Sequence, residues 1–224
     1  MAAVHFETLI ELSLNGRVAL ERVIAASAYG SALQAVASLT VFSHPQTVAQ
    51  VGPGSVFATV RNAGRRGQIF DREGRPCAYD DNKSPTDAFL WANGIARRPA
   101  DVQFNHLYQA SDDPGSYTAL QNLCVTPTFL AKLTDTDPVV RAHLQYRAFE
   151  LYGWTPAGRD VPGRPDGSDD LVWAPTLAHV DQVEQRMRTI MLRRPKDRTV
   201  QIATAIGWRF SGFEPDERLK GVIP

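Results

Sequence analysis

The sequence predicts an α+β protein in which helices dominate and the strands are few and short. Segments such as 138–152 and 176–194 carry apolar residues at intervals of three and four, as the buried face of a helix requires. Residues 68–79 instead form two short apolar runs on either side of a Gly-containing turn, a pattern typical of a β-hairpin. With 224 residues and 43% apolar content, the chain can bury a sizeable core in one domain or two small ones.

Charge and cysteine usage narrow the function classes. The chain has 24 Lys and Arg and 24 Asp and Glu, so its formal net charge of zero argues against a uniformly basic nucleic-acid coat. Most of the cations are Arg, the better bidentate partner for phosphate and guanine, although a GC-rich genome produces the same bias. No apolar run approaches the ~20 residues of a membrane span, and no signal peptide is predicted. The two cysteines, Cys77 and Cys124, fit a reducing, cytoplasmic location.

The pattern divides the chain into five regions. They are an N-terminal helical region (1–43), a helix-and-hairpin module (44–83), a strand–loop–strand–helix segment with flanking helices (84–153), a Gly- and Pro-rich loop (154–175) and a C-terminal helical region (176–224).

Helices are predicted over 6–14 and 17–39 in the first region, separated by Asn15-Gly16. The second helix is rich in Ala, which suits close helix packing, including packing against a second copy in a homodimer.

The module 44–83 reads as helix, tight turn, helix and hairpin. Pro45 suits the first turn of a helix that reaches Val51, and Ser55 suits the cap of a second helix that ends at Ala63. The hairpin at 68–79 follows. This order resembles a winged-helix DNA-binding module.

The resemblance implies a set of DNA-contacting arginines. Arg61 lies on the recognition helix and Arg65 and Arg66 at its end, while Arg72 and Arg75 lie on the wing. The alternative is that the same helices and hairpin serve only packing.

Residues 102–134, VQFNHLYQASDDPGSYTALQNLCVTPTFLAKLT, have a distinct layout. A short strand delivers Asn105 and His106 at its end, a polar loop follows, and a second apolar run carries Asn122 before a short helix reaches Lys132. The run "NHL…NLCVTPTFLAK" resembles the HNH family of endonucleases, which have a ββα-metal finger. The paired CxxC motifs of the zinc-stapled version are absent.

The resemblance implies roles for individual residues. His106 would be the base that deprotonates water, and Asn122 would orient its imidazole. Lys132, the last residue of the matched run, is the third catalytic candidate. Asn105 would help to hold a divalent metal, Mg or Mn. Where the family has a His or Asn metal ligand on the helix, this chain has only Leu130, Ala131 and Lys132, and none is a good ligand for a hard cation.

The run Asp80-Asp81-Asn82-Lys83 allows three interpretations. With Asp71 it satisfies the loose pattern of the PD-(D/E)xK nucleases, in which two acids, here Asp71 and Asp81, bind a metal and Lys83 positions water. It also fits the N-terminal cap of a helix over 85–93. Alternatively, Asp80 or Asp81 folds over to supply the metal ligand that the finger lacks.

The remaining segments predict helices over 137–152 and 176–194 and a strand or buried helix over 200–210. Arg97 and Arg98, just before the finger, could clamp a phosphate.

The sequence therefore predicts a metal-dependent endonuclease, of restriction or site-specific type, that acts on double-stranded DNA. Its main alternative is a winged-helix DNA-binding regulator without chemistry. A small-molecule enzyme that uses Asp81 and Lys83 is a third class.

Overall fold

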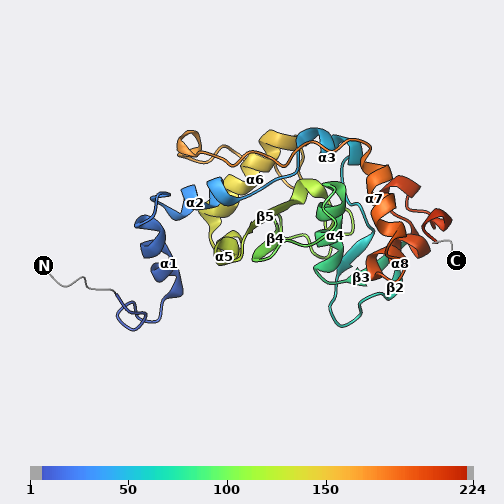
Figure 1. Ribbon diagram of the computed structural model, residues 1–224, viewed down its shortest axis with the longest axis horizontal. Coiled ribbons are helices and arrows are strands. Elements are labelled where there is room, and N and C mark those ends of the chain that lie inside the picture. The colour runs from blue at the N-terminus through green and yellow to red at the C-terminus, as the bar shows by residue number, and fades with distance from the viewer. Residues whose placement is uncertain (1–6, 221–224) are drawn as a thin grey trace, which may run out of the picture.

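The computed structural model describes residues 7–220 and has the mixed α+β architecture that the sequence predicts, with far more helix than strand (Figure 1). The helices are α1 (Gly16–Ala25), α2 (Ala32–Leu39), α3 (Pro45–Val51), α4 (Lys83–Ala92), α5 (Thr128–Thr136), α6 (Pro138–Tyr152), α7 (Val183–Leu192) and α8 (Arg198–Ile206). Single 3₁₀ turns are η1 (Leu120–Asn122), η2 (Ser168–Asp170), η3 (Arg209–Ser211) and η4 (Glu217–Leu219). The strands are β1 (Thr59–Arg61), β2 (Ile69–Arg72), β3 (Arg75–Asp80), β4 (Val102–His106) and β5 (Leu123–Pro127).

The strands form two small sheets. The first has the order β1-β3-β2, in which β1 runs parallel and β2 antiparallel to β3. The turn between β2 and β3 consists of Glu73 and Gly74, both with positive φ, which matches the right-handed twist of a tight hairpin. The predicted hairpin is therefore confirmed.

The second sheet is the antiparallel pair β4 and β5, and α5 follows β5 directly. The predicted order of strand, polar loop, strand and helix is thus present. The register pairs Asn105 with Cys124 and His106 with Leu123. Leu130 and Leu133 of α5 belong to the same buried cluster as Cys124, so α5 packs on the Cys124 side of the hairpin.

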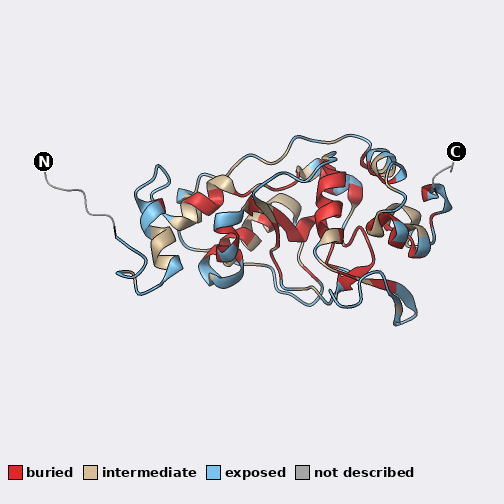
Figure 2. Cartoon of the chain, turned by 60° about the horizontal axis from the view of Figure 1, so that its bottom comes forward, coloured by how far each residue is buried: buried red, intermediate tan, exposed pale blue. Residues whose placement is uncertain are grey.

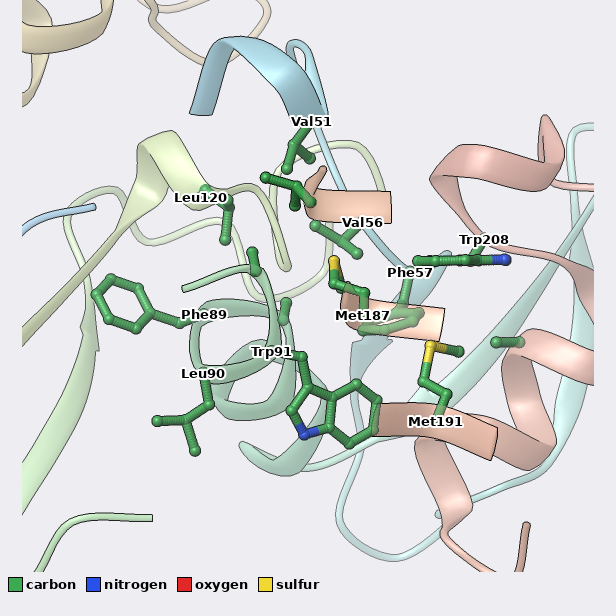
Figure 3. Close-up of a cluster of buried hydrophobic side chains, with 14 of the residues drawn as sticks. Val51, Val56, Phe57, Phe89, Leu90, Trp91, Leu120, Met187, Met191 and Trp208 are labelled. Atoms are coloured by element: carbon green, nitrogen blue, oxygen red, sulfur yellow. The ribbon is translucent and has the colours of Figure 1, made fainter. Parts of the chain in front are cut away.

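Helix α4 lies between the two sheets (Figure 1). Its residues 88–92 are almost fully buried. Phe89 packs edge-on against Phe104 of β4 at 5.6 Å between ring centroids, and the Ser84 hydroxyl hydrogen-bonds that of Thr59 on β1. On another side of α4, Trp91 packs edge-on against Phe57, and Phe57 stacks on Trp208. Met187 and Met191 of α7 belong to the same buried cluster (Figure 3).

A second cluster joins α2, β5, α5 and α6, and the N-terminal helices extend from it at one end of the molecule (Figures 1 and 2). There α1 buries Ile24, and several large apolar side chains on α1 and in the turns on either side of it are exposed. These are Leu9, Ile10, Leu14, Val23 and Tyr29.

The helix predicted over 55–63 is wrong. Ser55 makes an isolated bridge with Ala119, residues 56–58 form no helix, and β1 begins at Thr59. Val56, Phe57 and Val60 are β-branched or aromatic, and all are buried against partners remote in sequence. The helix-turn-helix of the winged-helix prediction is therefore missing, and Arg61 lies on a strand rather than on a recognition helix.

The N-terminal helices are also shorter than predicted. Residues 9–14 form turns, with Ser13 and Leu14 at positive φ, and Asn15 caps the start of α1 rather than ending a helix. Phe6, the predicted start of the first helix, lies outside the described residues. The helix predicted over 17–39 is broken between α1 and α2, where Gly30 has φ +70° and Ser31 caps α2.

The C-terminal half mixes confirmed and corrected elements. Helix α6 begins where Asp137 caps it, as predicted, and residues 153–170 have no regular structure except η2. The helix predicted over 176–194 is present only from Val183. The residues before it run extended, with Leu177 N–H donating to the carbonyl of Phe42. Residues 198–206 form α8, the buried-helix alternative. Among residues 7–220, no helix is both long and apolar enough to cross a lipid bilayer.

Candidate functional site

His106 ends β4, and its ring is held by Tyr117 in two ways. The rings stack with centroids 5.0 Å apart and planes 6° apart, and His106 Nε2 lies 2.8 Å from the Tyr117 carbonyl oxygen. A carbonyl can only accept a hydrogen bond, so Nε2 carries the proton of the neutral ring. Within residues 7–220, Nδ1 has no hydrogen-bond partner, and its lone pair can accept a proton.

The surroundings of His106 keep its imidazole neutral. Burial lowers the pKa of His106, the Tyr117 carbonyl acts in the opposite direction, and the positive charge of Arg61 lowers the pKa further. The net shift is downward from 6.5. Near pH 7 the ring is therefore unprotonated at Nδ1, the form that a general base requires.

Asn122 holds the loop between β4 and β5 rather than the imidazole itself. Its Oδ1 accepts from the Tyr108 N–H at 2.8 Å, and its Nδ2 donates to the Ser116 carbonyl at 3.1 Å. The side chain is fully buried. Within residues 7–220 no hydrogen bond joins Asn122 to the His106 ring, so the predicted direct contact is wrong. Asn122 fixes both ends of the loop, and Tyr117, next to Ser116, fixes the ring.

Asn105 lies on the opposite face of the hairpin from His106. Successive side chains on a strand alternate between faces, and Asn105 Nδ2 donates to Thr126 Oγ1 at 2.7 Å on the α5 side. Phe104 and His106 share the other face, where Phe104 contacts Phe89 of α4. The predicted metal ligand and the predicted base are therefore separated by the sheet.

Lys132, the third catalytic candidate, is exposed on α5. Because α5 covers the Asn105 face, Lys132 is not brought together with His106. The adjacent Leu130 and Ala131 are buried in the core.

The residues of the PD-(D/E)xK interpretation are not brought together. Asp71 pairs with Pro76 in the hairpin and accepts from the Gly74 N–H at its turn. Asp81 follows the far end of β3, about 16 Å along the strand at ~3.3 Å per residue. Lys83 Nζ donates to Asp197 at 2.8 Å and also contacts Asp87, so it ties α4 to the start of α8.

A cavity of about 600 Å³ opens between the end of β1, the start of α4 and the segment before β4, and His106 itself does not line it. Its lining carries five cations and two carboxylates, and we call it the charged cavity. The charged residues are Arg61, Arg66, Lys83, Arg98, Arg194, Asp81 and Asp87. The excess of cations favours an anionic ligand.

Contacts from both sides connect His106 to this cavity. The Tyr117 hydroxyl donates to the Asp81 carbonyl at 2.6 Å, so the ring that stacks on His106 reaches the cavity wall. Arg98 lies over the ring of Phe104, with its guanidinium carbon 5.6 Å from the centroid. Arg61 is close enough to His106 to lower its pKa.

The arginines predicted to bind DNA divide into two groups. Arg61, Arg66 and Arg98 line the charged cavity. The others do not: Arg65 lies over the Tyr79 ring, Arg72 donates to the Asp112 carbonyl near the hairpin turn, and Arg97 is exposed. Arg72 and Arg75 line a separate groove of about 980 Å³ that also holds Glu73, Asp113 and Glu214.

The residues proposed to hold a metal do not fit one. Asn105 and Asp81 lie on different sides of β4, and within residues 7–220 no three His, Cys, Asp or Glu side chains gather in a way that could hold an ion. The Asp81 carboxylate contacts Arg198 at 2.9 Å and Arg66 at 2.7 Å. Burial acts to raise the pKa of Asp81, but the Lys83 N–H and these arginines outweigh it and lower the pKa. Asp80 is fully buried beneath Arg198. Neither carboxylate folds over to the finger.

Three residues of the site escaped the sequence analysis. Tyr117 lies in a polar loop, and Arg194 and Arg198 lie far beyond residue 134, where the finger ends. Local patterns carry no signal for such contacts. Comparison of the chain with protein-family models, curated proteins and solved structures found no match.

Proposed function

We propose that the protein is a nuclease that cleaves DNA phosphodiester bonds, with His106 as the general base. In this proposal β4, the loop, β5 and α5 act as the ββα finger. The observation that carries the proposal is the pair of contacts between His106 and Tyr117. They fix the ring with Nδ1 unprotonated, and the Tyr117 hydroxyl joins it to the Asp81 carbonyl at the wall of a cavity with an excess of cations.

The chemistry follows from this geometry. In this proposal a phosphate held by the cavity arginines extends to His106, where Nδ1 accepts a proton from the attacking water. The Tyr117 carbonyl, which accepts from Nε2–H, stabilises the imidazolium that forms. Arginines at the cavity wall stabilise the charge on the non-bridging oxygens.

The test is cleavage of a plasmid by His106→Ala. Loss of a general base reduces the rate about 100-fold or more, and DNA affinity should remain because the cavity arginines are retained. The matched control is His179→Ala, since His179 contacts Gln50 and His44 away from the hairpin. Unchanged cleavage by His106→Ala would reject the assignment.

A second candidate is a protein that binds DNA without cleaving it. The poor fit of Asn105 and Asp81 to a metal favours it, because the related finger implies a metal-assisted reaction. This candidate predicts that wild-type protein retards DNA in a gel but leaves plasmid intact in Mg²⁺, Mn²⁺ and EDTA.

The homodimer stays a prediction. Cleavage of both strands needs two active centres or two successive nicks. The exposed apolar side chains along residues 9–29 are where a second copy would pack. Sedimentation of wild-type protein and of Ile10→Asp would test this interface.

A further inference from the structure

We infer that cleavage at this site proceeds without a bound divalent ion, and that arginines of the charged cavity neutralise the charge that an ion would otherwise neutralise. This inference rests on the proposed nuclease function and specifies how its active centre works.

The first support is the placement of the possible ligands. An ion that serves His106 must lie on the His106 face, but Asn105 is buried on the other face and donates to Thr126. At the helix positions where the family has a ligand, this chain has Leu130 and Ala131, which are buried, and Lys132, an exposed cation. Neither Asn105 nor these helix positions therefore offer an oxygen or imidazole ligand next to the base.

The second support is the state of the acids in the charged cavity. Asp81 is shared by Arg66 and Arg198, and Asp87 contacts Lys83 and accepts from the Thr199 hydroxyl at 2.7 Å. A divalent ion at either carboxylate would have to displace a cation that already neutralises it. Such an exchange gives up charge-assisted hydrogen bonds for each new metal bond.

The third support is a set of cations in the cavity that lack an acid. Within residues 7–220, no carboxylate pairs with Arg61, Arg98 or Arg194: Arg98 lies over Phe104, and Arg194 donates to the Ala96 carbonyl. Arg61 is exposed, and its charge acts on His106. A guanidinium without a carboxylate partner is suited to bidentate binding of phosphate oxygens.

The reaction balances without an ion. His106 Nδ1 accepts one proton of a water molecule, the water oxygen bonds to phosphorus, and the bond from phosphorus to the leaving oxygen breaks. The leaving oxygen takes a proton from a second water, and the resulting hydroxide recovers the proton from the imidazolium. Arg61 binds the non-bridging oxygens throughout, as a cation does at other phosphoryl-transfer sites.

The experiment measures cleavage of a fluorescent DNA duplex and of its single strand by wild-type protein in EDTA, Mg²⁺ and Mn²⁺. The inference predicts the same rate in EDTA as in Mg²⁺. It also predicts that Arg61→Ala lowers the rate about 100-fold in all three conditions. Arg61→Lys should keep part of the rate, and Arg186→Ala, on the exposed side of α7, should keep all of it. Thermal melting would confirm that each variant is folded.

The outcomes separate the two proposals. Cleavage that EDTA abolishes and Mg²⁺ or Mn²⁺ restores overturns the metal-free reaction and leaves the nuclease function standing. Metal-free cleavage that Arg61→Ala does not alter overturns the role of the arginine. No cleavage of either substrate in any condition overturns the nuclease function, and the inference with it.

Discussion

The two faces of the β4–β5 hairpin pack against different helices. On one face Asn105, Cys124 and Thr126 are buried beneath α5, and burial raises the pKa of the Cys124 thiol to about 12. On the other face Phe104 packs on α4, and His106 ends the strand and is linked through Tyr117 to the wall of the charged cavity. The Asn105 face, which we call the dry face, is buried core. The His106 face carries an ionisable side chain at the end of β4.

This difference teaches that adjacency in sequence does not bring two residues into one site. Asn105 and His106 are neighbours in the motif, but the two-residue repeat of a strand directs them to opposite faces. A residue on the dry face contributes to stability, and a residue on the open face can contribute to chemistry. Substitutions on the two faces should therefore separate unfolding free energy from cleavage.

The largest effect on stability is expected for Asn122→Ala. The substitution leaves the Tyr108 N–H and the Ser116 carbonyl without their buried partner, which costs about 3 kcal/mol of unfolding free energy. Cleavage should fall too, because the loop that carries Tyr117 is released. Urea denaturation measures the first effect and plasmid cleavage the second. Asn62→Ala, which loses one contact to Gly64 near the surface, is the control. Equal stability of the two variants would contradict this account.

Asn105→Ala should affect stability alone. It removes the hydrogen bond to Thr126 on the dry face, at a cost of roughly 1–2 kcal/mol. Cleavage by the folded variant should match that of wild type, measured at a temperature well below its melting point. If Asn105 held a metal for His106, this variant would lose cleavage while remaining folded, and the comparison of the two faces would fail.

The pH dependence of stability should carry a contribution from His106. Since burial lowers its pKa below 6.5 in the folded protein, the unfolded chain binds the proton more readily. The stabilisation is fully present above pH 6.5 and is lost as pH falls through the folded pKa. Denaturation curves should be measured between about pH 7.5 and pH 5, a range that spans the usual imidazole pKa. Over this range the unfolding free energy of His106→Ala should decline less steeply than that of wild type. Parallel curves for the two proteins would argue against the shift.

Tyr117→Phe should have the smallest effect. It removes only the hydroxyl that donates to the Asp81 carbonyl and preserves both the stacked ring and the carbonyl that accepts from His106. We expect a loss of about 1 kcal/mol and nearly normal cleavage. A large fall in cleavage would mean that the hydroxyl itself takes part in the reaction.

The sequence predicted the elements that local chemistry determines. Glu73-Gly74 sets the hairpin turn, Asp137-Pro138 starts α6, and the alternation before His106 gives β4. Of the residues it singled out, Arg61 and Arg98 line the charged cavity, and Asn122 holds the loop that carries Tyr117.

The errors arise where remote partners decide the backbone. Residues 55–63 were expected to be helical, but β1 pairs with β3 through Thr59 and Ala78. Leu177 was expected to be part of a helix. Its N–H instead donates to the carbonyl of Phe42, which lies far earlier in the chain. The predicted metal ligands Asn105 and Asp81 lie apart for the same kind of reason, since only the register shows which side chains share a face.

The most direct test of the central claim is ¹⁵N NMR of the His106 ring in the wild-type protein, assigned by comparison with His106→Ala. The account predicts a neutral ring at pH 7 with the proton on Nε2, an unprotonated Nδ1 and a pKa below 6.5. A ring that is protonated on Nδ1 at neutral pH, or that titrates above 6.5, would contradict it.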